Sequence, residues 1–239
     1  MARLRVLGSS SMGNSYVITV NNGDSIVLEL GMPIIDIQRA LDYREDSLKF
    51  VLVTHKHTDH SKFVDRAIQR GWRIFSNTET ANAHPGVEIL QPMKLYKLGD
   101  FIIRCFNVEH NAECYSYMIE HPDIGRLVFV TDAVAFPYRI KGIKHFLIEA
   151  NYSNDVIVDR MCNSEEYSST PTSHMSIENS LMAIKVNKSP ELENIILCHL
   201  SMGNSDEIGF KKLMEEEVPS ANVFIAEKGL EVEINKSVF

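Results

Sequence analysis

Three of the nine histidines lie within one seven-residue segment, Thr54 to His60, directly after the apolar run Phe50–Val53. The apolar run predicts a buried strand that carries the segment on the loop at its carboxyl end. Because alternate residues of an extended loop point the same way, His55 and His57 can converge on one ion, while Asp59 and His60 face a second. This His-x-His-x-Asp-His spacing therefore predicts a site for two metal ions.

Short strands are predicted on both sides of this segment, with helices after them. The predicted strands are Arg3–Leu7, Tyr16–Val20, Ser25–Leu30, Phe101–Asn107, Tyr115–Ile119, Leu127–Thr131 and Phe146–Glu149, with a further strand beginning at Ile74. Asn22-Gly23 predicts a tight hairpin. Apolar spacing predicts helices from Ser61 to a cap at Gly71, after His174, and after Ser205-Asp206.

The remaining polar stretch, Asn151 to Pro171, predicts a long loop or a short helix flanked by loops. Two strand-rich halves with outer helices predict an α/β fold, a four-layered αβ/βα sandwich. Residues 1–239 are expected to form a single domain.

Composition limits the class of protein. A net charge of -8 disfavours binding of a long nucleic acid duplex over a broad basic surface. A local basic patch is compatible with this charge. The absence of a secretory signal and of a long apolar stretch predicts a soluble, cytoplasmic protein with no membrane partner. Cys105, Cys114, Cys162 and Cys198 form no paired motif, so we expect ordinary, mostly buried thiols.

Later segments resemble the metallo-β-lactamase superfamily in the expected order. His110 in Val108-Glu109-His110-Asn111, Asp132 in Val130-Thr131-Asp132 and His199 in Cys198-His199-Leu200-Ser201 match its remaining ligand positions. The resemblance implies that Asp132 bridges two metals. It assigns His55, His57 and His110 to the first metal, and Asp59, His60 and His199 to the second.

This ligand set implies hydrolysis. Imidazole and carboxylate groups suit zinc, manganese or iron, with zinc or manganese expected here. Two divalent ions can share a hydroxide that acts as the nucleophile, so no serine or cysteine is needed.

The closest resemblance is to the YycJ-type (WalJ-type) branch, whose members are DNA exonucleases or uncharacterised hydrolases. It rests on Leu7 to Ser15, Thr54 to His60, Glu109 to Ala112, Thr131-Asp132, Ile148 to Asn151, Ser173 to Ser176 and His199 to Ser201. Ser173-His174-Met175-Ser176 also resembles the motif of ribonuclease Z, which implies that His174 protonates the leaving group. Two departures are Glu29, where the branch has Asp, and the missing glycine shortly after Asp59-His60.

The predicted catalytic residues are Asp59, His174 and Glu149. Glu149 either orients His174 or fills a buried capping role. Asn14 and Ser11, in the Gly8–Ser15 loop, are candidate substrate contacts, although the serines also suit a simple turn.

The leading hypothesis is a phosphodiesterase acting on nucleic acid or a nucleotide, and the resembling families suggest a homodimer. The alternatives are a cyclic-nucleotide phosphodiesterase of the phage anti-immunity type and a thioester or lactone hydrolase of the glyoxalase II type. In a thioester or lactone hydrolase, His174 would have no catalytic role. A protein that keeps metals for stability alone is a third alternative.

Overall fold

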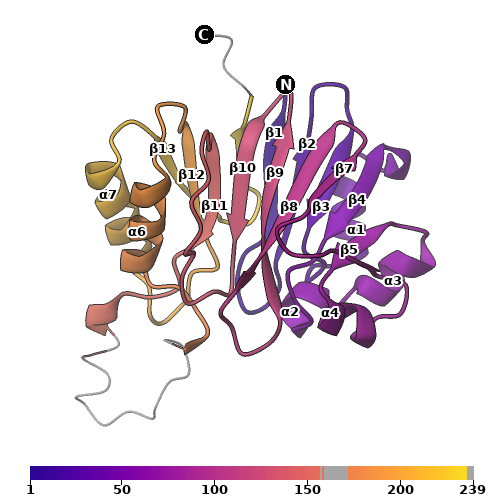
Figure 1. Cartoon of the computed structure of the whole chain (residues 1–239), viewed down its shortest axis with the longest axis horizontal. Helices are drawn as coiled ribbons and strands as arrows, with labels where there is room; N and C mark the ends of the chain where they lie inside the picture. The colour runs from indigo at the N-terminus through magenta and orange to yellow at the C-terminus, as the bar shows by residue number, and fades with distance from the viewer. Residues whose placement is uncertain (157, 159–171, 236–239) are drawn as a thin grey trace.

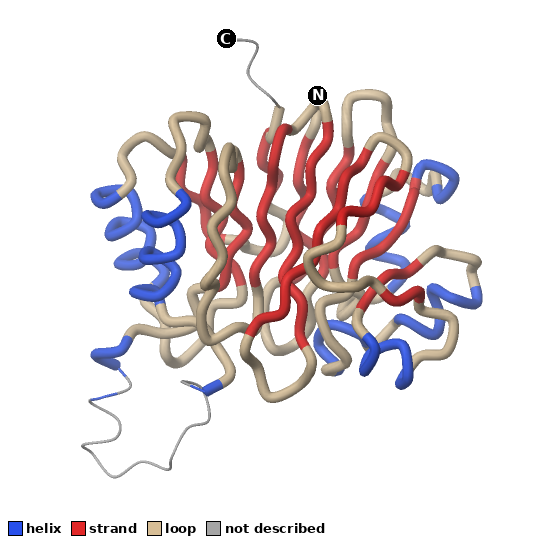
Figure 2. Tube along the Cα trace, viewed as in Figure 1, coloured by secondary structure: helices blue, strands red, loops and turns tan. Residues whose placement is uncertain are grey.

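The computed structural model of the chain describes residues 1–156, 158 and 172–235. Two seven-stranded sheets face one another in this part of the chain (Figure 1). Helices lie outside them, so four layers result, as the αβ/βα prediction requires. Figure 2 shows the strands in red at the centre and most helices in blue at the flanks.

The first sheet is built mainly from the N-terminal part of the chain. Its strands run in the order β14 (Glu231–Glu233), β1 (Arg3–Gly8), β2 (Ser15–Thr19), β3 (Ser25–Leu28), β4 (Leu48–Leu52), β5 (Ile74–Ser76) and β6 (Glu88–Ile89). The β1, β2 and β3 strands are antiparallel, and β2 and β3 form the predicted hairpin. From β3 to β6 the pairs are parallel.

The second sheet follows from Leu95 onward. Its strands run in the order β13 (Asn222–Ile225), β12 (Asn194–Cys198), β11 (His145–Glu149), β10 (Gly125–Val130), β9 (Cys114–His121), β8 (Phe101–Val108) and β7 (Leu95–Leu98). Pairs from β7 to β10 are antiparallel, and pairs from β10 to β13 are parallel. The carboxyl ends of β8, β10, β11 and β12 therefore lie at one edge.

Three apolar clusters hold the layers together. The largest lies between the sheets and includes Leu4, Phe50, Tyr117 and Phe129, all buried. A second packs α6 (Ile177–Asn187) and α7 (Glu207–Glu217) onto the second sheet. A third packs α1 (Ile34–Ala40) and α3 (Val64–Gln69) onto the first. Burial of these faces removes apolar surface from water and stabilises the sandwich.

The predicted helix from Ser61 differs in detail. Two short helices occupy this region, α2 (Thr58–Ser61) and α3, and the chain ends α3 before Gly71, whose φ of 78° suits the predicted cap. Helix α2 begins inside the histidine segment, so Asp59 and His60 lie on a helical turn. His57, the N-cap of α2, keeps an extended backbone, so the change from extended to helical backbone falls between His57 and Asp59.

Several elements are additional to the predicted set. They include α1, the 3-10 turn Glu45–Ser47, α4 (Thr78–Ala83), β6, β7, β13 and β14. Most of the Asn151–Pro171 segment, with Cys162, lies outside the described residues. The described thiols, Cys105, Cys114 and Cys198, are buried and free, as predicted. In the part of the chain that the structure describes, no helix has the length and apolar character needed to cross a membrane.

Candidate metal centre

The predicted metal ligands come from loops that follow four different strands. His55 lies three residues after β4, His110 two residues after β8, Asp132 two residues after β10, and His199 directly after β12. Asp132 and His199 have positive φ angles of 50° and 52°. Such angles are costly for residues with side chains and persist where surrounding structure fixes them, often at functional sites.

His55, His57 and His110 form the first cluster. His55 Nε2 lies 2.9 Å from His57 Nδ1, and His110 Nε2 lies 3.2 Å from the same atom. His110 Nδ1 lies 2.7 Å from the carbonyl oxygen of Ser173. Because a carbonyl only accepts hydrogen bonds, Nδ1 carries the proton and Nε2 presents a lone pair to the cluster.

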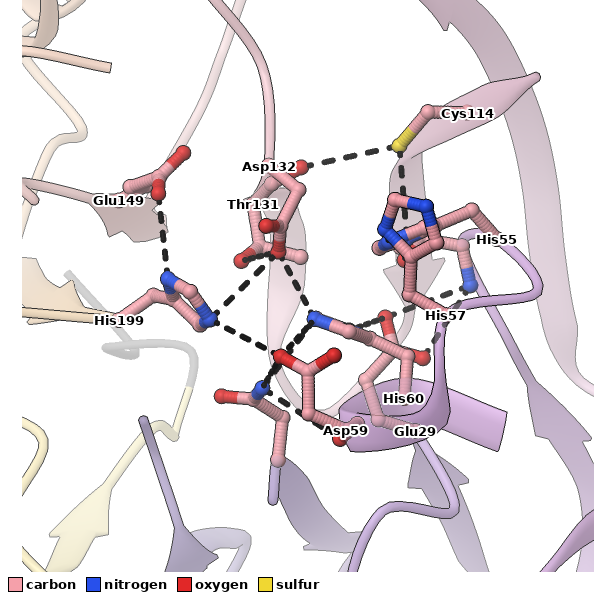
Figure 3. A network of polar contacts seen from close by, with 12 residues as sticks. Glu29, His55, His57, Asp59, His60, Cys114, Thr131, Asp132, Glu149 and His199 are labelled. Carbon is pink, nitrogen blue, oxygen red and sulfur yellow. Dashed lines mark hydrogen bonds and ion pairs between the residues drawn. The ribbon is translucent and has the colours of Figure 1, made fainter. Parts of the chain in front are cut away.

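Asp59, His60 and His199 form the second cluster. Asp59 Oδ2 lies 3.1 Å from His60 Nε2 and 3.4 Å from His199 Nε2. Asp132 Oδ2 lies 2.9 Å from His60 Nε2 and 3.8 Å from His199 Nε2. Ligand atoms of His55, His60 and Asp132 also lie within 4.8 Å of one another. Figure 3 shows Asp132 between His199 on one side and His55 and His57 on the other.

The two clusters differ in charge. Burial lowers the pKa of His55, His57 and His110, which keeps their imidazoles neutral and able to bind a cation. Burial also opposes protonation of His60 and His199. There the neighbouring carboxylates, Asp132 foremost, together outweigh burial and raise both pKa values, that of His199 to about 10.

The donor set fits divalent metal ions. In the first cluster, the Nε2 atoms of His55 and His110 both face Nδ1 of His57, and in the second the buried Asp132 carboxylate faces His60. A cation between these atoms removes the repulsion of facing lone pairs and neutralises the carboxylates. All seven predicted ligands belong to these clusters. Their assignment as ligands stays a prediction.

Glu149 contacts both histidines on its side of the centre. Its Oε1 lies 2.7 Å from His174 Nδ1 and 3.2 Å from His199 Nδ1 (Figure 3 shows the second contact). Its Oε2 accepts hydrogen bonds from the backbone N–H groups of Ala133 and Met175. Burial opposes protonation of His174, but Glu149 raises its pKa above the ordinary value. His174 Nδ1 also lies 3.3 Å from Asp132 Oδ1.

Glu29 belongs to the surroundings of the centre and is absent from the predicted site. It is fully buried, with a φ of 65°, and accepts hydrogen bonds from the Thr54 backbone N–H. Its Oε1 lies 3.3 Å from His60 Nδ1, so it can hold this imidazole with Nε2 toward Asp132. The sequence feature that could have indicated Glu29 as part of the site is the Glu-x-Gly motif, Glu29 to Gly31, at the end of an apolar strand.

The two candidate substrate contacts lie in different surroundings. Asn14 is buried, and its side-chain nitrogen lies 3.3 Å from Asp59 Oδ2 and 3.2 Å from His60 Nε2. Its backbone N–H donates to the Asp59 carbonyl. Ser11 is exposed on the same loop. Asn14 therefore touches the centre itself, and the roles of both residues toward a substrate stay predictions.

Comparison with known proteins identifies the fold. The family model described as the metallo-beta-lactamase superfamily matches residues 9–72. The structure of the metallo-beta-lactamase fold protein YhfI from Bacillus subtilis aligns over 97% of this chain and 98% of its own, with a TM-score of 0.75 and 17% identity. This chain has the metallo-β-lactamase fold.

Two curated relatives are similar in sequence as well. Exodeoxyribonuclease WalJ of Streptococcus pneumoniae is 24% identical over 171 residues, covering 64% of this chain and 63% of WalJ. Exodeoxyribonuclease YycJ of Bacillus anthracis is 24% identical over 221 residues, covering 84% of this chain and 83% of YycJ. The chain thus spans less than two thirds of the first relative's length. These similarities are to the branch whose motifs the sequence resembles.

Proposed function

We propose that this metallo-β-lactamase-fold protein is a metal-dependent hydrolase that cleaves phosphodiester bonds in nucleic acid. The observation that carries the proposal is the position of His174, which Glu149 holds at 2.7 Å beside Asp132. A proton donor at this point suits a reaction with a poor leaving group. The names of the exodeoxyribonuclease relatives support a nucleic acid substrate.

In this proposal the seven clustered residues hold two divalent ions, zinc or manganese. Bound there, the ions supply Lewis acidity, which produces hydroxide near neutral pH and neutralises phosphate oxygens. Glu29 and Glu149 hold His60 and His199 from behind, since each lies near the Nδ1 atom of its partner. Asn14 keeps Asp59 in place through both side-chain and backbone contacts.

His174 acts as the general acid. Its Nδ1 proton is held by Glu149, so Nε2 is the atom that transfers a proton to the departing oxygen. The side chain is 23% exposed, whereas His60 and His199 are almost fully buried, so a substrate can reach it. The raised pKa of His174 keeps the proton available near neutral pH.

The first test is a panel of duplex DNA, single-stranded DNA, RNA and cyclic mononucleotides, with added manganese or zinc. We expect the wild type to cleave DNA and to bind close to two metal ions per chain by elemental analysis. Asp59→Ala and His60→Ala should lose bound metal and at least ~100-fold in turnover. Turnover confined to cyclic mononucleotides would contradict the proposal, and activity that survives both substitutions would indicate a contaminant.

The role of His174 has its own test in the choice of leaving group. His174→Ala should lose ~100-fold or more on a dinucleotide, whose alkoxide must be protonated. It should lose much less on bis(p-nitrophenyl) phosphate, because nitrophenolate departs without a proton. An equal loss on both substrates, with bound metal unchanged, would contradict the assignment of His174 as the acid.

A further inference from the structure

A groove of about 500 Å³ lies on the outer face of the second sheet, and none of the predicted metal ligands lines it. Its floor is formed by β8, β9 and β10, and one wall is the connection between β10 and β11, which Figure 2 draws as a tan tube beside the strands. Ile102, Arg104 and Phe106 alternate along β8 and face this groove, whereas Ile103 and Cys105 face the core between the sheets. The lining is therefore the outer face of the sheet itself.

The groove is basic in an acidic protein. Arg104, Arg126, Arg139 and Lys141 line it, and Glu120 is the one acidic residue among the lining residues. Glu120 pairs with Arg126 at 2.7 Å. Within the described residues, Arg104, Arg139 and Lys141 make no ion pair, and Arg104 Nε is buried without a hydrogen-bond partner. The groove therefore has three basic side chains without an acidic partner among the described residues. The chain as a whole carries a net charge of -8.

Aromatic and apolar groups lie among these cations. Tyr138 is half-buried and packs on the buried rings of Phe106 and Phe136, whose centroids lie 4.8 Å and 5.5 Å from its own. Met93 and Leu95, on the opposite wall, are 54% and 53% exposed. A partly exposed aromatic ring among cations is typical of surfaces that bind single-stranded nucleic acid, where phosphates contact the charges and a base stacks on the ring.

The wall of the groove starts at the metal centre. The β10–β11 connection begins after Val130 and contains Asp132, and Val134 N–H donates to the carbonyl of Glu109, next to His110. Tyr138 OH then donates to the carbonyl of Asn107. Arg104 lies six residues before His110, which limits their separation to about 20 Å along an extended strand. A strand stacked as in a duplex rises about 3.4 Å per nucleotide, so this distance corresponds to at most about six nucleotides.

We propose that this groove binds the part of a single nucleic acid strand that lies up to about six nucleotides from the bond being cleaved. Arg139 and Lys141 contact its phosphates, and Tyr138 stacks on a base. The inference rests on the proposed function, because it assigns a polymer rather than a mononucleotide as the substrate. It also explains how a protein of negative net charge retains a polyanion: the contact is local.

The test compares oligonucleotides of different length. Fluorescein-labelled phosphorothioate single strands of 4 and 24 nucleotides, which resist cleavage, are titrated with the metal-loaded protein over a salt series. Arg139→Gln/Lys141→Gln should weaken binding of the 24-mer about tenfold at low salt. It should also reduce the slope of log K against log salt by about 1.4, because two phosphate contacts are lost. Binding of the tetranucleotide should change by less than twofold.

A matched control is Lys211→Gln/Lys212→Gln on α7, which makes the same change in net charge outside the groove. It should leave the salt slope of the 24-mer unchanged. A loss equal to that of the groove variant, or an equal loss for both oligonucleotide lengths, would overturn the proposal.

Two further measurements distinguish a nucleic acid strand from an acidic peptide in the groove, and a failure of this proposal from a failure of the proposed function. Tyr138→Ala should weaken the 24-mer several-fold, as loss of a stacking contact does. If it has no effect and polyglutamate competes as well as DNA at equal charge, the groove binds acidic peptides and the proposal is wrong. Because binding of phosphorothioate strands needs no turnover, a protein that binds them through the groove but cleaves no DNA would contradict the proposed function alone.

Discussion

Gly31 shows how closely single residues are constrained around the centre. A Cβ atom built at Gly31 would lie 1.7 Å from the backbone oxygen of Asp59 and 2.6 Å from the backbone nitrogen of Asn14. Both neighbours are backbone atoms, so neither can rotate away. Gly31→Ala must therefore displace the segment that carries Asp59 and His60. We expect a loss of several kcal/mol in unfolding free energy, at or above the range for overpacking, and less than one metal ion bound per chain.

Gly71 provides the matched control for this prediction. Its φ of 78° disfavours a side chain, but nothing lies within 4 Å of a Cβ atom there. Gly71→Ala should cost only about 1 kcal/mol of backbone strain and leave the metal content unchanged. Urea unfolding and elemental analysis of both variants check the pair. Equal metal content in Gly31→Ala and Gly71→Ala would show that the contact at Asp59 is not needed for the centre.

At the scale of elements, the N-cap of α6 should affect both the stability of the fold and the position of His174. Ser176 Oγ accepts a hydrogen bond from Asn179 N–H at 3.2 Å, and Ser176 lies two residues after His174. Asp206 caps α7 in the same way through Gly209 N–H. Ser176→Ala and Asp206→Ala should each cost about 1 kcal/mol, the usual effect of losing a helix cap.

The two cap variants should differ in activity. Because Ser176→Ala loosens the segment that holds His174, we expect turnover on a dinucleotide to fall several-fold, while Asp206→Ala should retain it. Urea unfolding and steady-state kinetics give the two readouts. A fall in turnover of the same size in both variants would mean that overall stability, and not the position of His174, governs the rate.

Elements with strong local signals could be predicted from the sequence. The predicted buried runs Phe50–Val53 and Phe146–Glu149 fall in β4 and β11, with Val53 just after the end of β4. Ser176 and Asp206 precede the two long helices. β14 could not be predicted, because Val232 alone of its residues is buried and its pairing with β1 joins the two ends of the chain. The short, exposed β6 gives no apolar pattern either.

At the scale of the whole molecule, the metal centre also combines contacts that local sequence predicts with contacts that depend on long-range packing. The His55–His60 segment is local, so its spacing predicted which side chains share a face. The contact of Glu149 with both His174 and His199 depends on how β11, β12 and the start of α6 pack. No local pattern records such packing. Glu29 likewise acquires its contact with His60 because β3 and β4 are parallel neighbours.

The stability of the whole fold should depend on pH through a histidine remote from the centre. His145 begins β11, is fully buried, and lies 3.0 Å from the side-chain nitrogen of Asn194. Burial lowers its pKa to about 4, with Lys144 adding to the effect and Glu193 opposing it. In the unfolded chain the pKa is about 6.5. Between these values the unfolded state binds the proton and the folded state does not, so stability falls as the pH drops from about 6.5 to 4.

The expected contribution of His145 is a loss of about 3 kcal/mol at pH 4 relative to pH 7. His145→Gln cannot titrate, so its unfolding free energy should fall less over this range, even if it is less stable than the wild type at pH 7. Urea unfolding at half-unit pH intervals measures the difference between the two proteins. The metal centre is common to both, so its own pH dependence cancels in that difference. Curves that stay parallel from pH 7 to 4 would show that His145 is protonated in the folded protein, which its buried position on β11 should prevent.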